Sequence, residues 1–375
     1  MHSSRIEYLD GLRGVACMMV VAGHYSGFFQ PSQAGMPFDD GFLAVAIFFV
    51  MSGFVLTESF SPTRYRLEGV LAARIFRLLT PTTMAIVAAS GLYLVFQPVA
   101  HEAAQKASLN GLWIQTQAAA LSELPGDLLA SIIGFSNTSA LHVSSFISSY
   151  RSADTPIWTI SYELYGSFLT IVVTRLYHFR RPLWLLAVIA SLCTFGFREV
   201  GLFVIGHVAR LVWYPEQMSQ WTRTLLSFGI FAAALCLMHA EFRCDGSALD
   251  AVSSGLLPHN SPLNGAHALA GTLVFAIVIY SKLLQRILSW RPFFILGRLS
   301  FSIYLIHWPI MLGFGSSLYL LIGSRSPIAT WLIFGAGATI TTMLAVLFER
   351  YIDAPAVALS RQIRNLRLAA KSYKS

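Results

Sequence analysis

Long apolar runs constrain this chain more than any other feature of its sequence. Of the 375 residues, 55% are hydrophobic and only 12% are charged, whereas a soluble protein of this length needs about 25% charged residues. In lipid, backbone polar groups find partners only within a helix or a closed barrel, and these runs are too long and too uniformly apolar for barrel strands. The sequence therefore predicts an all-α polytopic membrane protein.

Apolar runs of about 17–25 residues are long enough to cross a bilayer as a helix. Ten such runs are present, at 9–29, 41–58, 79–98, 155–175, 182–198, 199–214, 223–240, 265–283, 297–323 and 327–350. A further apolar piece at 126–135 is too short to span, and we interpret it as interfacial or re-entrant. The sequence predicts about ten transmembrane helices.

The charges in the loops orient these helices. Arginine and lysine gather in the alternate segments 59–78, 175–181, 282–291 and 351–375. Between them, 30–40 carries no basic residue and 99–154 carries only Lys106 and Arg151. Because basic loops stay in the cytoplasm, ten spans place every basic segment and both termini there, with 351–375 as a basic tail. An eleventh span at 126–135 would put the tail and two basic loops on the wrong side.

The chain has no internal repeat, and we expect a single membrane domain over residues 1–375 without a soluble domain. Its one sizeable external loop, 99–154, is either a solvated connector or a lid over an external substrate. The net charge of +8 fits positive-inside loops rather than nucleic-acid binding, because no basic surface is interleaved with exposed aromatic residues. The four cysteines have no metal-site or disulfide spacing, so no metal centre is expected.

Polar residues inside the apolar runs are the best candidates for function, because an ionisable group in lipid is costly without a cavity or a partner. Arg13 and His24 are eleven residues apart, so they share one helix face and lie about 16 Å apart along its axis. Arg13 is then expected near the inner interface and His24 near mid-depth.

Other spans bring polar groups to similar depths. Ser52, Ser161, Glu163 and His307 are expected in the central slab, and Arg74, Arg77 and Arg298 at the cytoplasmic level. Arg74 and Arg77 are three residues apart and share a helix face, a geometry that suits phosphate binding. The alternatives are membrane anchors for the arginines, helix packing for the serines, a helix-kink histidine at 307, and a buried structural pair of His24 and Glu163.

Six motifs in order give the chain a family resemblance. They are "LDGLRGVACMMVVAGHY" with Asp10, Arg13 and His24, "FFVMSGFVLT" with Ser52, "RIFR" with Arg74 and Arg77, "PIWTISYELYG" with Ser161 and Glu163, "LGRLSFSIYLIHWPI" with Tyr304 and His307, and "FERYIDAP". Over essentially its whole length the chain resembles the acyltransferase 3 family of integral-membrane acyltransferases. It departs from the family pattern at Thr159, where a serine is usual.

The resemblance implies a bacterial inner-membrane enzyme that moves an acyl group, usually acetyl, from cytoplasmic acyl-CoA to a hydroxyl of a surface glycan or its lipid-linked intermediate. It implies that His24 is essential and that Arg13, Arg74 and Arg77 serve the CoA side. Some members carry an extracytoplasmic hydrolase-like domain, which is not expected here. The thioester supplies the driving force, so acyl-CoA is a substrate, and no permanently bound cofactor is expected.

From these residues we form a mechanistic hypothesis. His24 acts as general base on the acceptor hydroxyl or carries the acyl group itself. Glu163 orients His24, as a carboxylate does in hydrolase triads, and Ser52, Ser161 or backbone amides stabilise the oxyanion. Asp10, Tyr304 and His307 are candidates for supporting roles.

Two other functions stay open at this point. A small molecule such as a macrolide could be the acceptor in place of a glycan. A proton-coupled transporter or flippase, with His24, Glu163 and His307 as a proton relay, would also explain ionisable groups in the membrane, although no inverted repeat is evident. Beyond the donor and acceptor, the expected partner is membrane lipid; a homo-oligomer is left open.

Overall fold

The computed structural model describes residues 6–29, 40–60, 66–107, 155–196, 198–212, 263–324 and 326–372, with scattered residues between 219 and 230. Within these ranges every regular element is a helix and there is no strand. The predicted all-α class is therefore confirmed for the described part of the chain. The apolar piece at 126–135, most of the loop 99–154 and most of the run 223–240 lie outside the described residues.

The described elements follow one another in the order of the predicted runs. They are α1 (Glu7–Phe29), α2 (Gly41–Ser59), α3 (Leu67–Lys106), the short η1 (Thr155–Ile157), α5 (Trp158–Phe179), α6 (Arg181–Phe195), α7 (Glu199–Val212), α10 (Gly265–Tyr280), α11 (Lys282–Leu288), α12 (Arg291–Ile310), α13 (Ser316–Ile322), α14 (Pro327–Phe348) and α15 (Ala354–Ser372), with two π-helical turns, η3 (Met311–Gly315) and η4 (Glu349–Asp353). All the predicted runs except 223–240 fall on these helices.

Fewer described helices than predicted are both long and apolar enough to cross a membrane. Four qualify by length and composition: Gly41–Ser59, Leu67–Leu92, Arg291–Ile322 and Pro327–Asn365. The pair α10 and α11, bent by 93°, would be a fifth if it forms one broken span. Helices α1 and α5 are long enough but carry ionisable and hydroxyl side chains, and α6 and α7 are short. The described helices therefore leave the count of ten unconfirmed.

Two segments predicted to lie outside the spans are helical. Arg74 and Arg77 lie within α3, which begins at Leu67 rather than after residue 78. The basic segment 351–375 is not a loose tail over its described residues, because η4 and α15 continue the helix of α14 to Ser372. Pro355, which has no N–H to donate within a helix, lies two residues after the π-helical turn η4, so the irregular turn adjoins the proline.

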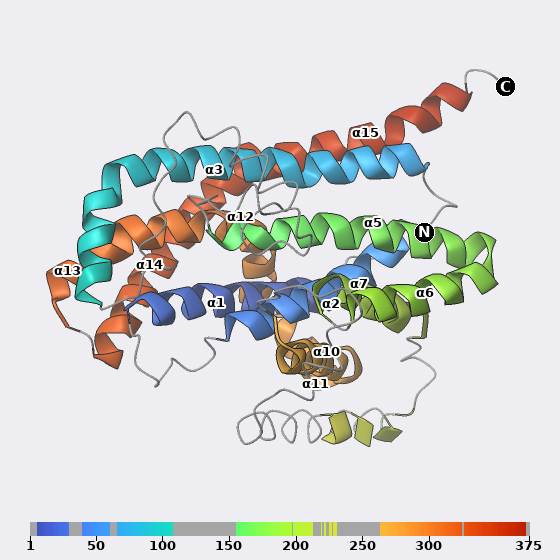
Figure 1. Ribbon diagram of the computed structural model, residues 1–375, viewed down its shortest axis with the longest axis horizontal. Helices are drawn as coiled ribbons and strands as arrows, with labels where there is room; N and C mark the ends of the chain where they lie inside the picture. Colours follow the sequence, from blue (N-terminus) through green and yellow to red (C-terminus); the bar gives the residue numbers. More distant parts are fainter. Residues whose placement is uncertain are drawn as a thin grey trace.

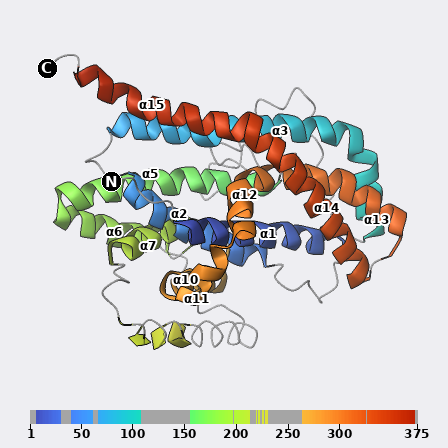
Figure 2. The same cartoon turned by 180° about the vertical axis from the view of Figure 1, so that it is seen from behind.

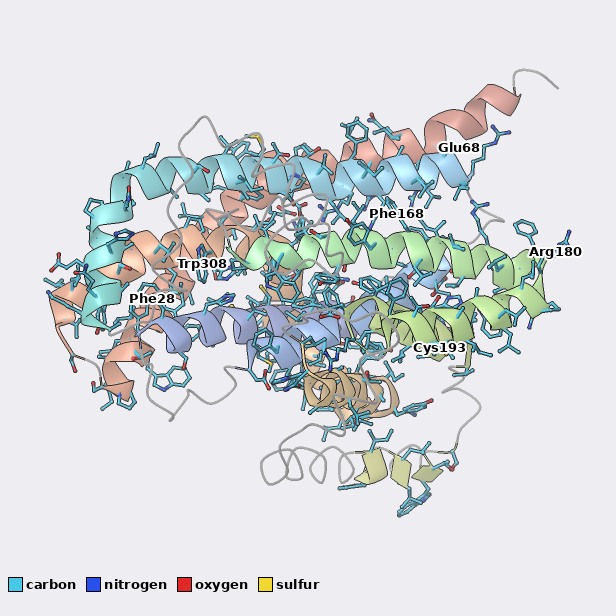
Figure 3. The ribbon with its side chains drawn as sticks, viewed as in Figure 1. Phe28, Glu68, Phe168, Arg180, Cys193 and Trp308 are labelled. Atoms are coloured by element: carbon cyan, nitrogen blue, oxygen red, sulfur yellow. The ribbon has the colours of Figure 1, made fainter. Side chains whose placement is uncertain are left out.

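The helices form a bundle with distinct sides. Figures 1 and 2 show α15 lying along α3 on one side of the bundle and α10 and α11 on the opposite side. Figure 3 places Glu68 and Arg180 at one end of the bundle, well away from Phe28 and Trp308. The core between these sides is built chiefly from α1, α2, α5, α7 and α12.

Glycines let α1 and α12 approach to backbone contact. A Cβ atom added at Gly297 would lie 1.9 Å from the Asp10 carbonyl oxygen, and one added at Gly14 would lie 2.6 Å from the Gly297 nitrogen. One turn on, Cys17 Sγ donates to the Ser300 carbonyl at 3.2 Å, a pair separated by 283 residues in sequence. Gly14 and Gly297 have the same separation. A constant offset means that α1 and α12 run parallel and in register.

A second glycine contact joins α2 to α7. Added Cβ atoms at Gly53 and Gly206 would each come within 2.0 Å of a main-chain oxygen of the facing helix, that of Phe203 or of Val50. Small residues at helix interfaces are typical of membrane bundles, because packing rather than the hydrophobic effect holds helices together in lipid.

The α1–α12 contact yields a stability prediction. Gly297→Ala should lower the melting temperature of the detergent-solubilised protein clearly, because its methyl group can be accommodated only by moving the two backbones apart. Gly335→Ala is the matched control, since nothing lies within 4 Å of a Cβ at that helical position; alanine there should be neutral or stabilising by up to about 1 kcal/mol. Equal melting temperatures for the two variants would contradict the close contact.

Candidate active site

The α1–α12 register brings two histidines together. His24 Nδ1 lies 2.9 Å from His307 Nε2, again with a separation of 283 residues. The two rings lie nearly parallel, with centroids 5.1 Å apart and an interplanar angle of 15°, so with the 2.9 Å contact they meet edge to edge; the Trp308 ring is nearly perpendicular to His24, with centroids 5.1 Å apart. His307 is fully buried, whereas His24 keeps part of its surface exposed. The pair therefore has a closed side at His307 and an accessible side at His24.

The residue one turn before His307 ties the pair to the start of α5. The Tyr304 hydroxyl donates to the Pro156 carbonyl and lies 2.6 Å from the Thr159 hydroxyl, while the Tyr304 carbonyl lies 2.7 Å from His307 Nδ1. Thr159, the position at which the motif departs from the family pattern, is thus a hydrogen-bonding residue of the site. Tyr304 connects the beginning of "PIWTISYELYG" to the histidine pair.

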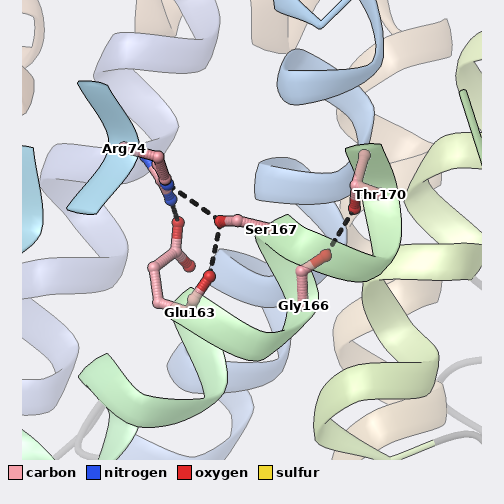
Figure 4. A network of polar contacts seen from close by, with 5 residues as sticks. All are labelled: Arg74, Glu163, Gly166, Ser167 and Thr170. Carbon is pink, nitrogen blue, oxygen red and sulfur yellow. Dashed lines mark hydrogen bonds and ion pairs between the residues drawn. The ribbon is translucent and has the colours of Figure 1, made fainter. Parts of the chain in front are cut away.

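Glu163 does not contact His24. Its carboxylate accepts a hydrogen bond from Arg74 Nη2, and Arg74 Nε donates to the Ser167 hydroxyl at 2.8 Å (Figure 4). Ser167 in turn donates to the Glu163 carbonyl of the preceding turn, as Thr170 does to the Gly166 carbonyl. The expectation that Glu163 orients His24 is therefore wrong for this structure. The pair also puts Glu163 and Arg74 at one level, whereas the sequence predicted Glu163 in the central slab and Arg74 nearer the cytoplasm.

Arg77 and Arg298 are paired through the π-turn η4. Arg77 makes a two-pronged contact with the Asp353 carboxylate and lies over the Phe301 ring, 4.8 Å from its centroid. Arg298 donates to Glu349 at 2.9 Å. Arg74 and Arg77 thus point to different elements, α5 and η4, although they are three residues apart on one helix.

Arg13 forms the fourth such pair, at the beginning of α1. Its Nη1 lies 3.4 Å from Asp10 Oδ1, and about a third of its side chain is exposed. Each of the arginines assigned to the cytoplasmic level is therefore held by a carboxylate. Arg13 and Arg298 adjoin Gly14 and Gly297 in sequence, and His24 lies about three helical turns further along α1.

The remaining candidates have weaker support. Ser161 is buried in α5 and Ser52 is half-buried in α2, and neither has a described contact with the histidine pair. No group of three or more histidine, cysteine or acidic side chains suited to a metal ion occurs within the described ranges.

A third histidine, His207, was not singled out from the sequence. It is fully buried and hydrogen-bonded to Thr57 at 2.9 Å and Trp184 at 3.0 Å, a saturated structural arrangement.

Comparison with known proteins agrees with these motifs. A family model described as an acyltransferase domain matches residues 6–350. The O-acetyltransferase OatA of Staphylococcus aureus is 23% identical over 95% of this chain, which spans 58% of that relative's length. A protein of Rhizobium radiobacter, protein 2 in the picA locus, is 38% identical over 19% of this chain and 34% of its own. No solved structure matches the chain.

The two acidic residues of η4 provide an internal comparison of ion-pair burial. Asp353→Asn should destabilise the protein more than Glu349→Gln. Asp353 and its partner Arg77 are 6% and 25% exposed at the side chain, whereas Arg298, the partner of Glu349, is 53% exposed. Breaking a buried pair costs up to about 3–5 kcal/mol, and an exposed pair about 0–1 kcal/mol. Melting temperatures in detergent give the ranking; a larger loss for Glu349→Gln would refute it.

Proposed function

The chain belongs to the acyltransferase 3 family, and we propose that it is a membrane-bound O-acyltransferase. It moves an acyl group, most simply acetyl, from cytoplasmic acyl-CoA to a hydroxyl of a surface glycan or its lipid-linked intermediate. The observation that carries the proposal is the His24–His307 pair, in which His307 is buried inside the helical bundle and His24 is half-buried, separated along α1 from Arg13. The name of the staphylococcal relative, an O-acetyltransferase, supports acetyl as the group and oxygen as the acceptor atom.

His24 is the general base in this proposal, since it is the histidine of the pair with exposed surface. It takes the proton from the acceptor hydroxyl as the oxygen attacks the thioester carbonyl. A carbon–oxygen bond forms, the carbon–sulfur bond breaks, and the proton passes from His24 to the departing CoA thiolate. The products are the acylated acceptor and free CoA, and no redox change occurs.

The arginines are proposed to bind the phosphates of the donor. Arg74 and Arg77 each have a carboxylate partner, and phosphate carries more negative charge and more acceptor oxygens than a carboxylate. Acyl-CoA is therefore expected to compete with Glu163 and Asp353 for these guanidinium groups. The pantetheine arm would then extend along α1 from the level of Arg13 to His24, a rise of about 16 Å.

We propose the membrane orientation that the loop charges predict, with ten spans and both termini in the cytoplasm of a bacterial inner membrane. The basic turn at Arg180 and the N-terminal end of α3 at Glu68 lie at one end of the bundle, as expected if this end faces the cytoplasm. The donor arginines would then be reached from the cytoplasm, where acyl-CoA is made.

Replacement of His24 tests the function. In membrane vesicles supplied with labelled acetyl-CoA and the glycan fraction of the host, His24→Ala should abolish label transfer, because the hydroxyl loses its base, while the amount of inserted protein is unchanged. His178→Ala, at an exposed position near the end of α5, is the matched control and should transfer normally. A wild-type protein that moves solute without cleaving the thioester would be a transporter, and the proposal would be wrong.

Replacement of Arg74 tests the donor site. Arg74→Lys keeps the charge but loses the planar fork that bonds Ser167 and Glu163 together, so KM for acetyl-CoA should rise about tenfold or more with a smaller effect on the acceptor. Arg210→Lys is the control, because Arg210 pairs with Glu58 at 2.6 Å outside the proposed site. Initial rates at varied acetyl-CoA concentration give KM for each variant. An unchanged KM in Arg74→Lys would contradict the role of Arg74 in binding the donor.

The acceptor is best identified in cells. Surface glycans of a deletion strain should lack an acetyl substituent that returns with the wild-type gene but not with His24→Ala, and mass spectrometry detects the difference. Glycans that are identical in all three strains would exclude a glycan acceptor and favour a small-molecule acceptor.

A further inference from the structure

The hydrogen-bonded row formed by Tyr304, His307 and His24 has a direction. A carbonyl oxygen only accepts hydrogen bonds, so His307 Nδ1, 2.7 Å from the Tyr304 carbonyl, must carry a proton and donate it. If His307 is neutral, its Nε2 has no proton and can only accept. The nitrogen 2.9 Å from it, His24 Nδ1, is then the donor. The remaining nitrogen, His24 Nε2, is left with a lone pair.

The opposite direction would require a cation in the bundle. For His307 Nε2 to donate to His24, His307 would have to carry both protons and a positive charge. His307 is fully buried, and the partners described for its ring are Tyr304, the backbone of Ile303 and the ring of His24, with no carboxylate among them. Glu163, the carboxylate that the sequence had suggested as the partner of His24, is engaged by Arg74. An uncompensated buried cation is costly, so the neutral row is favoured.

We propose that His307 is a positioning residue that fixes His24 in the tautomer protonated at Nδ1, so that Nε2 is the base. The inference rests on the proposed function and deepens it. In hydrolase triads a carboxylate orients the catalytic imidazole in this way; here a neutral histidine, itself oriented by a main-chain carbonyl, does so. When His24 takes the proton of the hydroxyl on Nε2, His307 Nε2 and the Tyr304 carbonyl dipole stabilise the resulting imidazolium.

The surroundings hold the row rigid. The Tyr304 carbonyl cannot move freely, because the Tyr304 hydroxyl is bonded to Pro156 and Thr159 at the start of α5. The His307 ring, edge to edge with His24, and the nearly perpendicular Trp308 ring confine the His24 ring on two sides. The glycine contact of Gly14 with Gly297 sets the axial position of one histidine against the other. Together these contacts leave His24 one orientation.

The tautomer can be measured without any acyl transfer. In the full-length protein, reconstituted in lipid with ¹⁵N-labelled histidine, the His24 signals are assigned by their loss in His24→Ala. Wild-type protein should show a neutral His24 with the proton on Nδ1. His307→Gln, which offers an amide oxygen close to the position of Nε2, should keep this tautomer, and His307→Leu should not. A wild-type His24 protonated on Nε2 alone would overturn the proposal.

Kinetics tests the consequence for catalysis. His307→Leu should lower kcat roughly 10²–10⁴-fold, the usual contribution of a positioned base, with KM for acetyl-CoA unchanged, and His307→Gln should recover most of kcat. Tyr304→Phe keeps the main-chain carbonyl and should keep the His24 tautomer. Equal kcat for the Leu and Gln variants would overturn the positioning role. If wild-type protein transfers no acyl group, the proposed function fails, while the ¹⁵N experiment still decides the tautomer.

Discussion

The backbone contact between α1 and α12 is the constraint on which the candidate site depends. Two helices that meet through Gly14 and Gly297 cannot slide past each other without creating a clash or losing packing. Their parallel register then repeats the same separation at Cys17 and Ser300 and again at His24 and His307. A contact of small residues near one end of the helices thus fixes the geometry of polar residues further along. The site is a consequence of helix packing rather than of loop structure.

Electrostatics divides the site into two levels with different chemistry. The arginine level is charged, and its cations are held by Asp10, Glu163, Glu349 and Asp353. The histidine level has no carboxylate in its described contacts and consists of a neutral hydrogen-bonded row. Pairing lowers the cost of charge in a low-dielectric region, and it also means that an anionic ligand must exchange with a carboxylate rather than simply bind. The proposed donor and the proposed base therefore meet different environments.

Sequence reasoning placed the candidate residues on helices better than it predicted which side chains they contact. The spacing of Arg13 and His24 correctly placed both on one helix, and rise per residue brought His307 to the level of His24. The same reasoning paired Glu163 with His24, because depth along an axis does not tell which neighbour a side chain faces. That choice depends on how α3, α5 and α12 are rotated and packed, which needs long-range contacts. For the same reason Asp353 was not matched with Arg77, and the helical continuation of α14 into α15 was missed.

The neutrality of the histidine row has a consequence for an enzyme in an energised membrane. A voltage across the bilayer does work on charges, about 2.3 kcal/mol per elementary charge for each 100 mV. His24 and His307, as a row without net charge, hold no charge for this voltage to move before the reaction begins, and the field acts only on the dipoles of the two rings. The orientation of the base is then the same in energised and in de-energised membranes. An unpaired imidazolium in the same place would carry a net charge, and the resting state of the site would then follow the voltage.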